Sequence, residues 1–260
     1  MRIIERCEHK YQIDSPKLYQ VRNQILACRM ELDNYSRNGP YYVRSLYFDS
    51  DDYHSLYENL GGCWGRIKLR IRSYCEEPSD RISVELKTKR GNHSIKYSTF
   101  ISYSCYETFI KTRHFPKNNN PVLIEFERLV HLRNFQPKVL IEYNREGLRS
   151  QSGSNLRITF DTNIRSAPAS ELFPKRQTFR THYTKGAILE IKCMGRQPRW
   201  LSQCVQQHGL KWIANSKYVQ SISLRPDVLK RSAAQLMMPV QTPKDQRQIQ
   251  DSRYGTTANI

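Results

Sequence analysis

Hydrophobic and polar residues alternate with a period of two along most of residues 1–224, a pattern that predicts β-strands. The predicted strands are rich in Ile, Val, Tyr, Phe and Thr, and Gly, Asn and Pro separate them. They cover residues 2–13, 41–48, 67–74, 81–88, 94–101, 139–146, 156–161, 187–193 and 221–224. So many short strands predict a protein built on an antiparallel sheet, either open or closed into a barrel.

Four segments have helical periodicity instead. Residues 16–30 follow Asp14 and Ser15, which are candidate N-caps, and Pro16 suits the first helical position. Segments 121–134 and 198–209 also begin with proline, and residues 104–113 form a fourth predicted helix. The fold class is therefore α+β, with helices attached to a β-rich body.

The composition changes at residue 225. Residues 225–260 are poor in aromatic residues and rich in Gln, Ser, Pro and Thr, so we expect a disordered tail after one folded domain of residues 1–224. The sequence contains no run of about 18 apolar residues. It also lacks an apolar signal at its start and any Cys-x-x-Cys pair. These features predict a cytoplasmic protein without a transmembrane segment, and its seven histidines show no metal-binding spacing.

The net charge changes this picture of an ordinary β protein. The chain has 42 Lys and Arg residues against 24 Asp and Glu residues, a formal net charge of +18. Most of this excess lies within residues 1–224 rather than in the tail. Such an excess indicates an anionic partner: nucleic acid, an acidic membrane surface, a nucleotide or a phosphate polymer.

The charges also follow the strand period. Residues two apart share a face of a strand, and strand after strand carries cations and single carboxylates on one face. The set includes Arg6, Glu8, Lys10, Lys68, Arg70, Arg72, Glu85, Lys87, Glu142, Glu190 and Lys192, and also Arg157 with Thr159 and Asp161. A half-buried sheet with a solvated face would explain the alternation alone. Long cations mixed with carboxylates favour a barrel with helices outside and a charged interior that binds phosphates and a divalent metal. Nucleic acid is not expected, because carboxylates on the same face would repel its backbone.

Several motifs on these strands carry a family resemblance. Arg6-x-Glu8-x-Lys10 is similar to the Glu-x-Glu-x-Lys motif of the triphosphate tunnel enzymes, also called the CYTH group. The chain resembles more closely the VTC domain, the polyphosphate polymerase branch of that superfamily. The matching segments are YVRSLYFD at 42–49, GRIKLRIRSY at 65–74, VELK at 84–87, EYNR at 142–145, LRITFD at 156–161, LEIK at 189–192 and SKY at 216–218.

The resemblance implies an antiparallel eight-stranded β-barrel, the triphosphate tunnel, with helices packed outside. It also implies that the γ-phosphoryl group of ATP is transferred to a growing polyphosphate chain, with Mn²⁺ or Mg²⁺ as cofactor. The partners would then be ATP and polyphosphate or pyrophosphate. Whether a membrane partner is engaged stays open.

The resemblance assigns roles residue by residue. The positions expected to be catalytic are Lys10, Arg70, Arg72, Lys87, Arg145, Arg157 and Lys217. The further substrate-binding positions are Arg6, Lys68, Lys96, Tyr143, Lys192 and Ser216. The metal ligands are Glu190, Glu8 and Glu85, although Glu85 is alternatively a salt-bridge partner that orients a cation.

Two positions depart from the family pattern. Arg6 stands where hydrolytic tunnel enzymes carry a first metal-binding Glu, which fits the polymerase branch better than a triphosphatase. Ala214 stands where some relatives carry Lys. Two alternatives stay open: another tunnel enzyme, such as a triphosphatase or nucleotide cyclase, and a non-catalytic module that binds polyphosphate or nucleic acid.

Overall fold

The computed structural model describes residues 6–90, 93–152, 154–182, 186–225 and 228. The chain divides into two units, residues 1–224 and residues 225–260. The fold described below is that of the first unit. The predicted disordered tail lies almost entirely outside the described residues and stays a prediction, as does the part of the first predicted strand before Arg6.

Ten antiparallel strands form one sheet, as the alternating pattern predicts. Eight of them follow one another in the order β1-β10-β8-β7-β3-β4-β5-β6, while β2 pairs with β7 and β9 pairs with β8. The strands are β1 Arg6–Ile13, β2 Met30–Leu32, β3 Tyr41–Asp49, β4 Gly65–Ser73, β5 Ile82–Arg90, β6 His93–Ile101, β7 Gln136–Ser150, β8 Arg157–Pro168, β9 Arg180–Thr181 and β10 Ala187–Met194. The short strands β2 and β9 were not predicted, because two or three residues carry no readable period.

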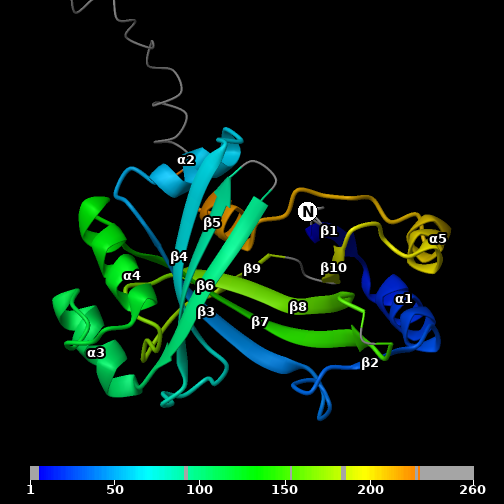
Figure 1. Cartoon of the computed structure of the whole chain (residues 1–260), viewed down its shortest axis with the longest axis horizontal. Helices are drawn as coiled ribbons and strands as arrows, with labels where there is room; N and C mark the ends of the chain where they lie inside the picture. The colour runs from blue at the N-terminus through cyan, green and yellow to red at the C-terminus, as the bar shows by residue number, and fades with distance from the viewer. Residues whose placement is uncertain (1–5, 91–92, 153, 183–185, 226–227, 229–260) are drawn as a thin grey trace, which may run out of the picture. The chain divides into compact units, whose positions relative to one another are not determined.

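The sheet curls without closing. Among the described residues β1 and β6 are the two edges of the eight-strand path, and no backbone pairing joins them. The expected closed barrel is therefore not confirmed, although the antiparallel eight-strand path is. In Figure 1, β4, β5 and β6 run steeply across the long β7 and β8. The curl brings side chains of non-adjacent strands together, since Lys87 Nζ on β5 lies 3.7 Å from Glu8 Oε2 on β1.

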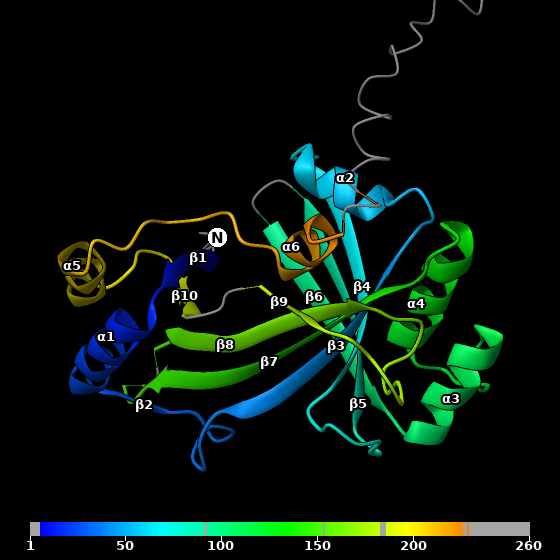
Figure 2. The same cartoon turned by 180° about the vertical axis from the view of Figure 1, so that it is seen from behind.

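Helices cover the outer face of this curled sheet in two groups. Helices α3 and α4 lie together at one end of the sheet, and α1 and α5 lie together at the other, in both views (Figures 1 and 2). The helices are α1 Ser15–Ala27, α2 His54–Leu60, α3 Tyr103–Thr112, α4 Pro121–Leu132, α5 Arg199–Gln207 and α6 Lys217–Ser223. In the part of the chain that the structure describes, no helix has the length and apolar character needed to cross a lipid bilayer.

The first hydrophobic core lies between α3, α4 and strands β3 to β6. Its centre is aromatic: the rings of Phe109 and Phe115 stack with centroids 4.1 Å apart. Phe126 of α4 meets Phe48 of β3 edge-on at 5.5 Å. These fully buried rings hold the helix pair onto the apolar face of the strands, so the opposite face of β3 to β6 is left for polar side chains.

The second core lies under α1 and α5, against β1, β8 and β10. Val21 and Ile25 of α1 are fully buried there, four residues apart on the face that the sequence periodicity predicts. Helix α1 begins where expected, because the side chain of Asp14 accepts a hydrogen bond from the backbone N–H of Lys17. Both ends of the sheet thus have an apolar outer layer.

One predicted strand is wrong. Residues 221–224 belong to the end of α6 and the residue that follows it. Tyr218, Ser221 and Ile222 are buried at helical spacing, and Ser216 caps the helix by accepting a hydrogen bond from Val219 N–H. In so short a segment, burial of one helical face outweighs the β-propensity of its residues.

Helix α2 was not predicted from the sequence. The Asp49 carboxylate at the end of β3 accepts hydrogen bonds from the backbone N–H groups of Ser55 and Leu56 in this helix. The N-terminal turn of α2 is thereby fixed to the end of β3.

The fold predicts a steep difference between two positions of α4. Phe126→Ala removes a fully buried ring, and we expect it to lower the free energy of unfolding by about 3–5 kcal/mol. Leu132→Ala at the exposed end of the same helix should cost less than about 0.5 kcal/mol. Urea denaturation measures both. Similar losses for the two variants would show that α4 does not hold the core as described.

Candidate functional site

One face of the curled sheet collects the predicted site residues. The strand registers align them across neighbouring strands, with Lys10 of β1 opposite Glu190 of β10, and Glu190 opposite Thr159 of β8. We call this surface the charged face. It carries Glu8, Lys10, Lys68, Arg70, Arg72, Glu85, Lys87, Lys96, Tyr143, Arg145, Arg157, Glu190 and Lys192. The backbone of Arg6 begins β1, but its side chain lies outside the described part of the structure.

Three lysines stand side by side on the charged face. Lys68, Lys87 and Lys96 are direct partners on β4, β5 and β6. Like charges directly opposite one another destabilise a sheet. Burial and the neighbouring cations, including Lys10 and Lys87, lower the pKa of Lys68 to about 8. This lysine row is therefore short of negative charge.

Next to the lysine row, two arginines are held by a buried carboxylate. Arg70 donates from Nε and Nη2 to Glu85 Oε2, at 2.8 and 2.6 Å. Arg72 Nη1 and Lys96 Nζ lie 3.8 and 3.1 Å from Glu85 Oε1. With three cations around it, Glu85 fits the alternative role of a salt-bridge partner, and its carboxylate has little capacity left for a metal.

Tyr47 of β3 belongs to the same group, although sequence reasoning gave it no role. Its buried hydroxyl accepts a hydrogen bond of 2.8 Å from Arg70 Nη1. Burial alone would raise the pKa of Tyr47, but Arg70 and Arg72 lower it to about 8. The charges around Tyr47 favour an anion at this position.

A second buried carboxylate, Asp161, organises the centre of the charged face. Arg145 donates from Nε to Asp161 Oδ1 at 2.6 Å and from Nη2 to Oδ2 at 2.7 Å, and Lys217 Nζ also donates to Oδ2. Burial would raise the pKa of Asp161, but Arg145 and Lys217 hold it at about 2. Tyr143 packs beside both cations, with its ring 5.2 Å from the Arg145 guanidinium carbon and 4.8 Å from Lys217 Nζ.

The edge formed by β1 and β10 holds the third group of charges. Lys10 Nζ lies 2.9 Å from Glu8 Oε1, and Lys192 contacts Glu190. Burial would raise the pKa of Glu190, but Lys192, Lys10 and Arg145 hold it well below its ordinary value. Glu8 and Glu190 are diagonal neighbours on this edge, so two ionised carboxylates lie close together among lysines.

These residues fit a divalent cation. Thr159 lies directly opposite Glu190, and its buried hydroxyl has no hydrogen-bond partner among the described residues. A hydroxyl and two carboxylates are the oxygen ligands that Mg²⁺ and Mn²⁺ prefer. Glu190, Glu8 and Thr159 would therefore hold such an ion, while Lys10 and Lys192 supply the positive charge next to the carboxylates in this structure.

Arg157 lies nearer the rim. Its Nη2 donates to Asp33 Oδ2 at 2.9 Å and lies 3.5 Å from the Tyr41 hydroxyl, and 44% of its side chain is exposed.

The predicted position of Glu142 is wrong. The strand alternation that placed it with the interior charges puts it on the other face, paired with Arg44 and Arg165.

A segment between α5 and α6 crosses from β1 to the centre of the charged face. Ile213 N–H donates to the backbone oxygen of Lys10, and the Asn215 backbone oxygen accepts from Lys10 Nζ at 3.0 Å. Lys68 Nζ then donates to Ser216 Oγ at 3.1 Å, one residue before Lys217 reaches Asp161. The segment thus links the free edge of β1 to β4 and β8.

Sequence reasoning placed Asp161 and Thr159 on the polar side of their strand but gave them no role. The sequence does indicate that these residues share a face, because Arg157, Thr159 and Asp161 stand two residues apart. The sequence does not indicate that Arg145 is the partner of Asp161, since the two meet only through the β7–β8 register.

Asp161 should contribute a pH-dependent part of the stability. Its pKa is about 2 in the folded protein against an ordinary 3.8, so the stabilisation is complete above pH 3.8 and is lost as pH falls toward about 2. Across that window we expect the unfolding free energy of the unmutated protein to fall by roughly 2 kcal/mol more than that of Asp161→Asn. Urea denaturation at stepped pH measures the difference. Parallel declines would contradict the Asp161 assignment.

Comparisons with known proteins agree with this architecture. Residues 5–225 match the family described as VTC domain. Vacuolar transporter chaperone complex subunit 4 of Schizosaccharomyces pombe is 25% identical over 228 residues, which cover 70% of this chain. The chain spans only 31% of that relative's length.

A solved structure shares the fold. The crystal structure of a candidate adenylate cyclase from Bacillus halodurans has a TM-score of 0.52 and 13% identity, and the match covers 84% of this chain and 96% of that protein. At that identity the likeness concerns the fold alone. The family match extends over nearly the whole first unit and includes every strand of the charged face, so the chain belongs to the VTC domain family.

Proposed function

We propose that this protein is an ATP-dependent polyphosphate polymerase, which transfers the γ-phosphoryl group of ATP to a growing polyphosphate chain. The observation that carries the proposal is the lysine row of Lys68, Lys87 and Lys96 on a face that also holds Glu190. Lys87 and Lys96 pair with Glu8 and Glu85, but each of these carboxylates also pairs with another cation, so a polyanion that lies along the row would stabilise it. Carboxylates within the same face suit a divalent cation that accompanies the phosphates.

In the mechanism we propose, the protein positions the triphosphate and the acceptor chain and neutralises their negative charge. Arg70, Arg72 and Arg145 would bind the triphosphate oxygens through the guanidinium N–H groups that do not bond to Glu85 or Asp161. The lysine row would hold the acceptor end of the chain against its own repulsion. An acceptor phosphate oxygen forms a bond to the γ-phosphorus, the bond from that phosphorus to the β–γ bridging oxygen breaks, and ADP leaves.

Glu190, Glu8 and Thr159 would hold Mn²⁺ or Mg²⁺, which would supply positive charge to the phosphates. The transfer needs no protein nucleophile, because the acceptor phosphate supplies the attacking oxygen. Arginines already fixed by Glu85 and Asp161 need little reorganisation during the reaction, which favours stabilisation of the transition state.

Two alternatives make different predictions. A triphosphatase or cyclase would release free phosphate or a cyclic nucleotide instead of a polymer, and a non-catalytic module would bind polyphosphate without turnover. The test is incubation of the purified protein with ATP, Mn²⁺ and a pyrophosphate primer, followed by a polyphosphate-stained gel. A ladder of long chains supports polymerisation, and its absence together with tight polyphosphate binding would replace it with the binding module.

The assembly of this protein is also part of the proposal. The Schizosaccharomyces pombe relative is named as a subunit of the vacuolar transporter chaperone complex. We propose that this chain likewise acts with a membrane-associated partner, and co-purification from detergent-solubilised membranes tests this.

Arg70 should be central to polymerisation. Arg70→Ala removes the guanidinium fork, and we expect a loss of roughly 10²–10³-fold in the rate of chain synthesis. Arg70→Lys keeps the positive charge opposite Glu85 but not the fork, so it distinguishes lost geometry from lost folding. Arg128→Ala is the matched control, because Arg128 is an exposed residue of α4 that pairs only with nearby Glu125 among the described residues. Equal rates for Arg70→Ala and Arg128→Ala would remove Arg70 from the site.

The positive charge of Lys68 should lower the stability of the unliganded protein and raise its affinity for polyphosphate. Lys68→Met keeps much of the chain length but removes the charge that its neighbours disfavour. We expect the unliganded variant to melt higher, by about 2–4 °C for each kcal/mol gained. We expect its affinity for tripolyphosphate to fall about 10–100-fold. Thermal denaturation and calorimetric titration measure the two effects. A lower Tm together with unchanged affinity would contradict the role of the lysine row.

A further inference from the structure

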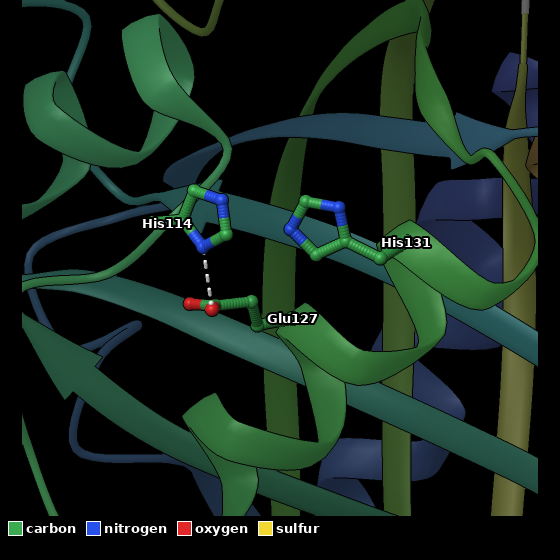
Figure 3. Close-up of side chains that lie close together, drawn as sticks. All are labelled: His114, Glu127 and His131. Atoms are coloured by element: carbon green, nitrogen blue, oxygen red, sulfur yellow. Dashed lines mark hydrogen bonds and ion pairs between the residues drawn. The ribbon is translucent and has the colours of Figure 1, made fainter.

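A cluster of metal-ligating side chains lies away from the charged face, where α3 connects to α4. His114 follows α3, and Glu127 and His131 lie four residues apart on α4. One ligand atom from each residue lies within 4.8 Å of the others, and no other such cluster of three occurs in the described part of the chain. Figure 3 shows the two imidazole rings side by side next to the Glu127 carboxylate.

We propose that His114, Glu127 and His131 form a zinc site. Two imidazole nitrogens and one carboxylate oxygen are a ligand set that Zn²⁺ takes in proteins, with a water molecule in the fourth position. The charged face offers oxygen and ammonium groups instead, so the two places differ in the metal that they prefer. The cluster is independent of the proposed polymerase activity.

The carboxylate is already oriented for this role. Glu127 Oε2 accepts a hydrogen bond of 2.8 Å from the backbone N–H of Phe115, while Oε1 faces His114 Nδ1 at 2.8 Å. Phe115 is buried and stacks on Phe109, so the backbone group that holds Glu127 is itself fixed. A ligand whose second oxygen is bonded to the protein is typical of metal sites.

His131 completes the cluster from the same face of α4. Side chains four residues apart on a helix are neighbours, so Glu127 and His131 act as a pair. His131 Nε2 lies 3.2 Å from the backbone oxygen of Arg113, next to His114. The residues that would bind zinc thus already connect the α3–α4 segment to α4.

Zinc binding requires one local movement. Tetrahedral zinc with bonds of about 2.0–2.2 Å places its ligand atoms roughly 3.3 Å apart. The imidazole rings now stack with centroids 4.6 Å apart and an interplanar angle of 25°. An ion in the plane of both rings requires at least one ring to rotate, and the 62% exposed side chain of His114 can do so by changing its rotamer. The bound ion would link residues 113–120 to α4, the helix that covers the first core.

The experiment is a zinc titration of the full chain without an affinity tag, by competition with a chromophoric chelator. We expect His131→Asn and His114→Asn each to weaken one equivalent of bound zinc by more than the roughly 10–100-fold that loss of an outer-shell partner costs. Zinc should also raise the Tm of the unmutated protein by mass action and leave the Tm of both variants nearly unchanged. Both histidines are exposed, so we expect the variants to fold, and circular dichroism checks this.

Two control variants isolate the cluster. His54 has an exposed side chain and pairs with Glu58, four residues away at 3.0 Å, but it belongs to no cluster of three within the described part of the chain. His54→Asn should therefore leave zinc binding unchanged, and Glu190→Gln should do the same if zinc does not bind at the charged face. Zinc bound by thiols is common to all variants and cancels. Equal zinc stoichiometry and affinity in His131→Asn and the unmutated protein, or loss only in Glu190→Gln, would overturn the proposal.

Discussion

Mutual repulsion among cations is the constraint on which this structure depends. Curling the sheet brings Lys10, Lys68 and Lys87 near one another on a partly enclosed surface, where water screens their charges poorly. The fold offsets part of this repulsion with single buried carboxylates, Glu85 and Asp161, each placed between cations. At the lysine row the compensation is incomplete, because the two carboxylates that Lys87 and Lys96 contact are shared with other cations, and there a polyanionic ligand would have most to contribute.

This arrangement requires a strict division between the two faces of the sheet. Phe126 and its aromatic neighbours hold α3 and α4 on one part of the outer face, while Val21 and Ile25 hold α1 on another. Because side chains alternate along each strand, a residue whose side chain packs in one of these cores is followed by a residue whose side chain lies on the charged face. The hydrophobic cores therefore position the charges as much as they stabilise the protein.

The sequence alone predicted the features that depend on short-range order. The period of two located eight of the ten strands and selected most side chains of the charged face, including Lys10, Arg70 and Glu190. It could not give the partner of each charge, because Arg145 meets Asp161 through a strand register set by the whole sheet. It also misassigned residues 221–224, since a helix of seven residues shows its burial pattern only when its neighbours are known. The His114 cluster escaped notice because it depends on how the connection after α3 folds back onto α4. Closure of the sheet, too, depends on long-range geometry that no local pattern encodes.

Ser216 shows how closely architecture and chemistry are joined here. One hydroxyl oxygen both starts α6 and receives the ammonium group of Lys68 from across the sheet. The helix that places Lys217 next to Asp161 is therefore capped by an atom that also bonds to a lysine of the lysine row. Replacement of Ser216 by an apolar residue would remove both the cap of α6 and the hydrogen-bond acceptor of Lys68. A residue with a similar oxygen, such as threonine, would preserve both interactions.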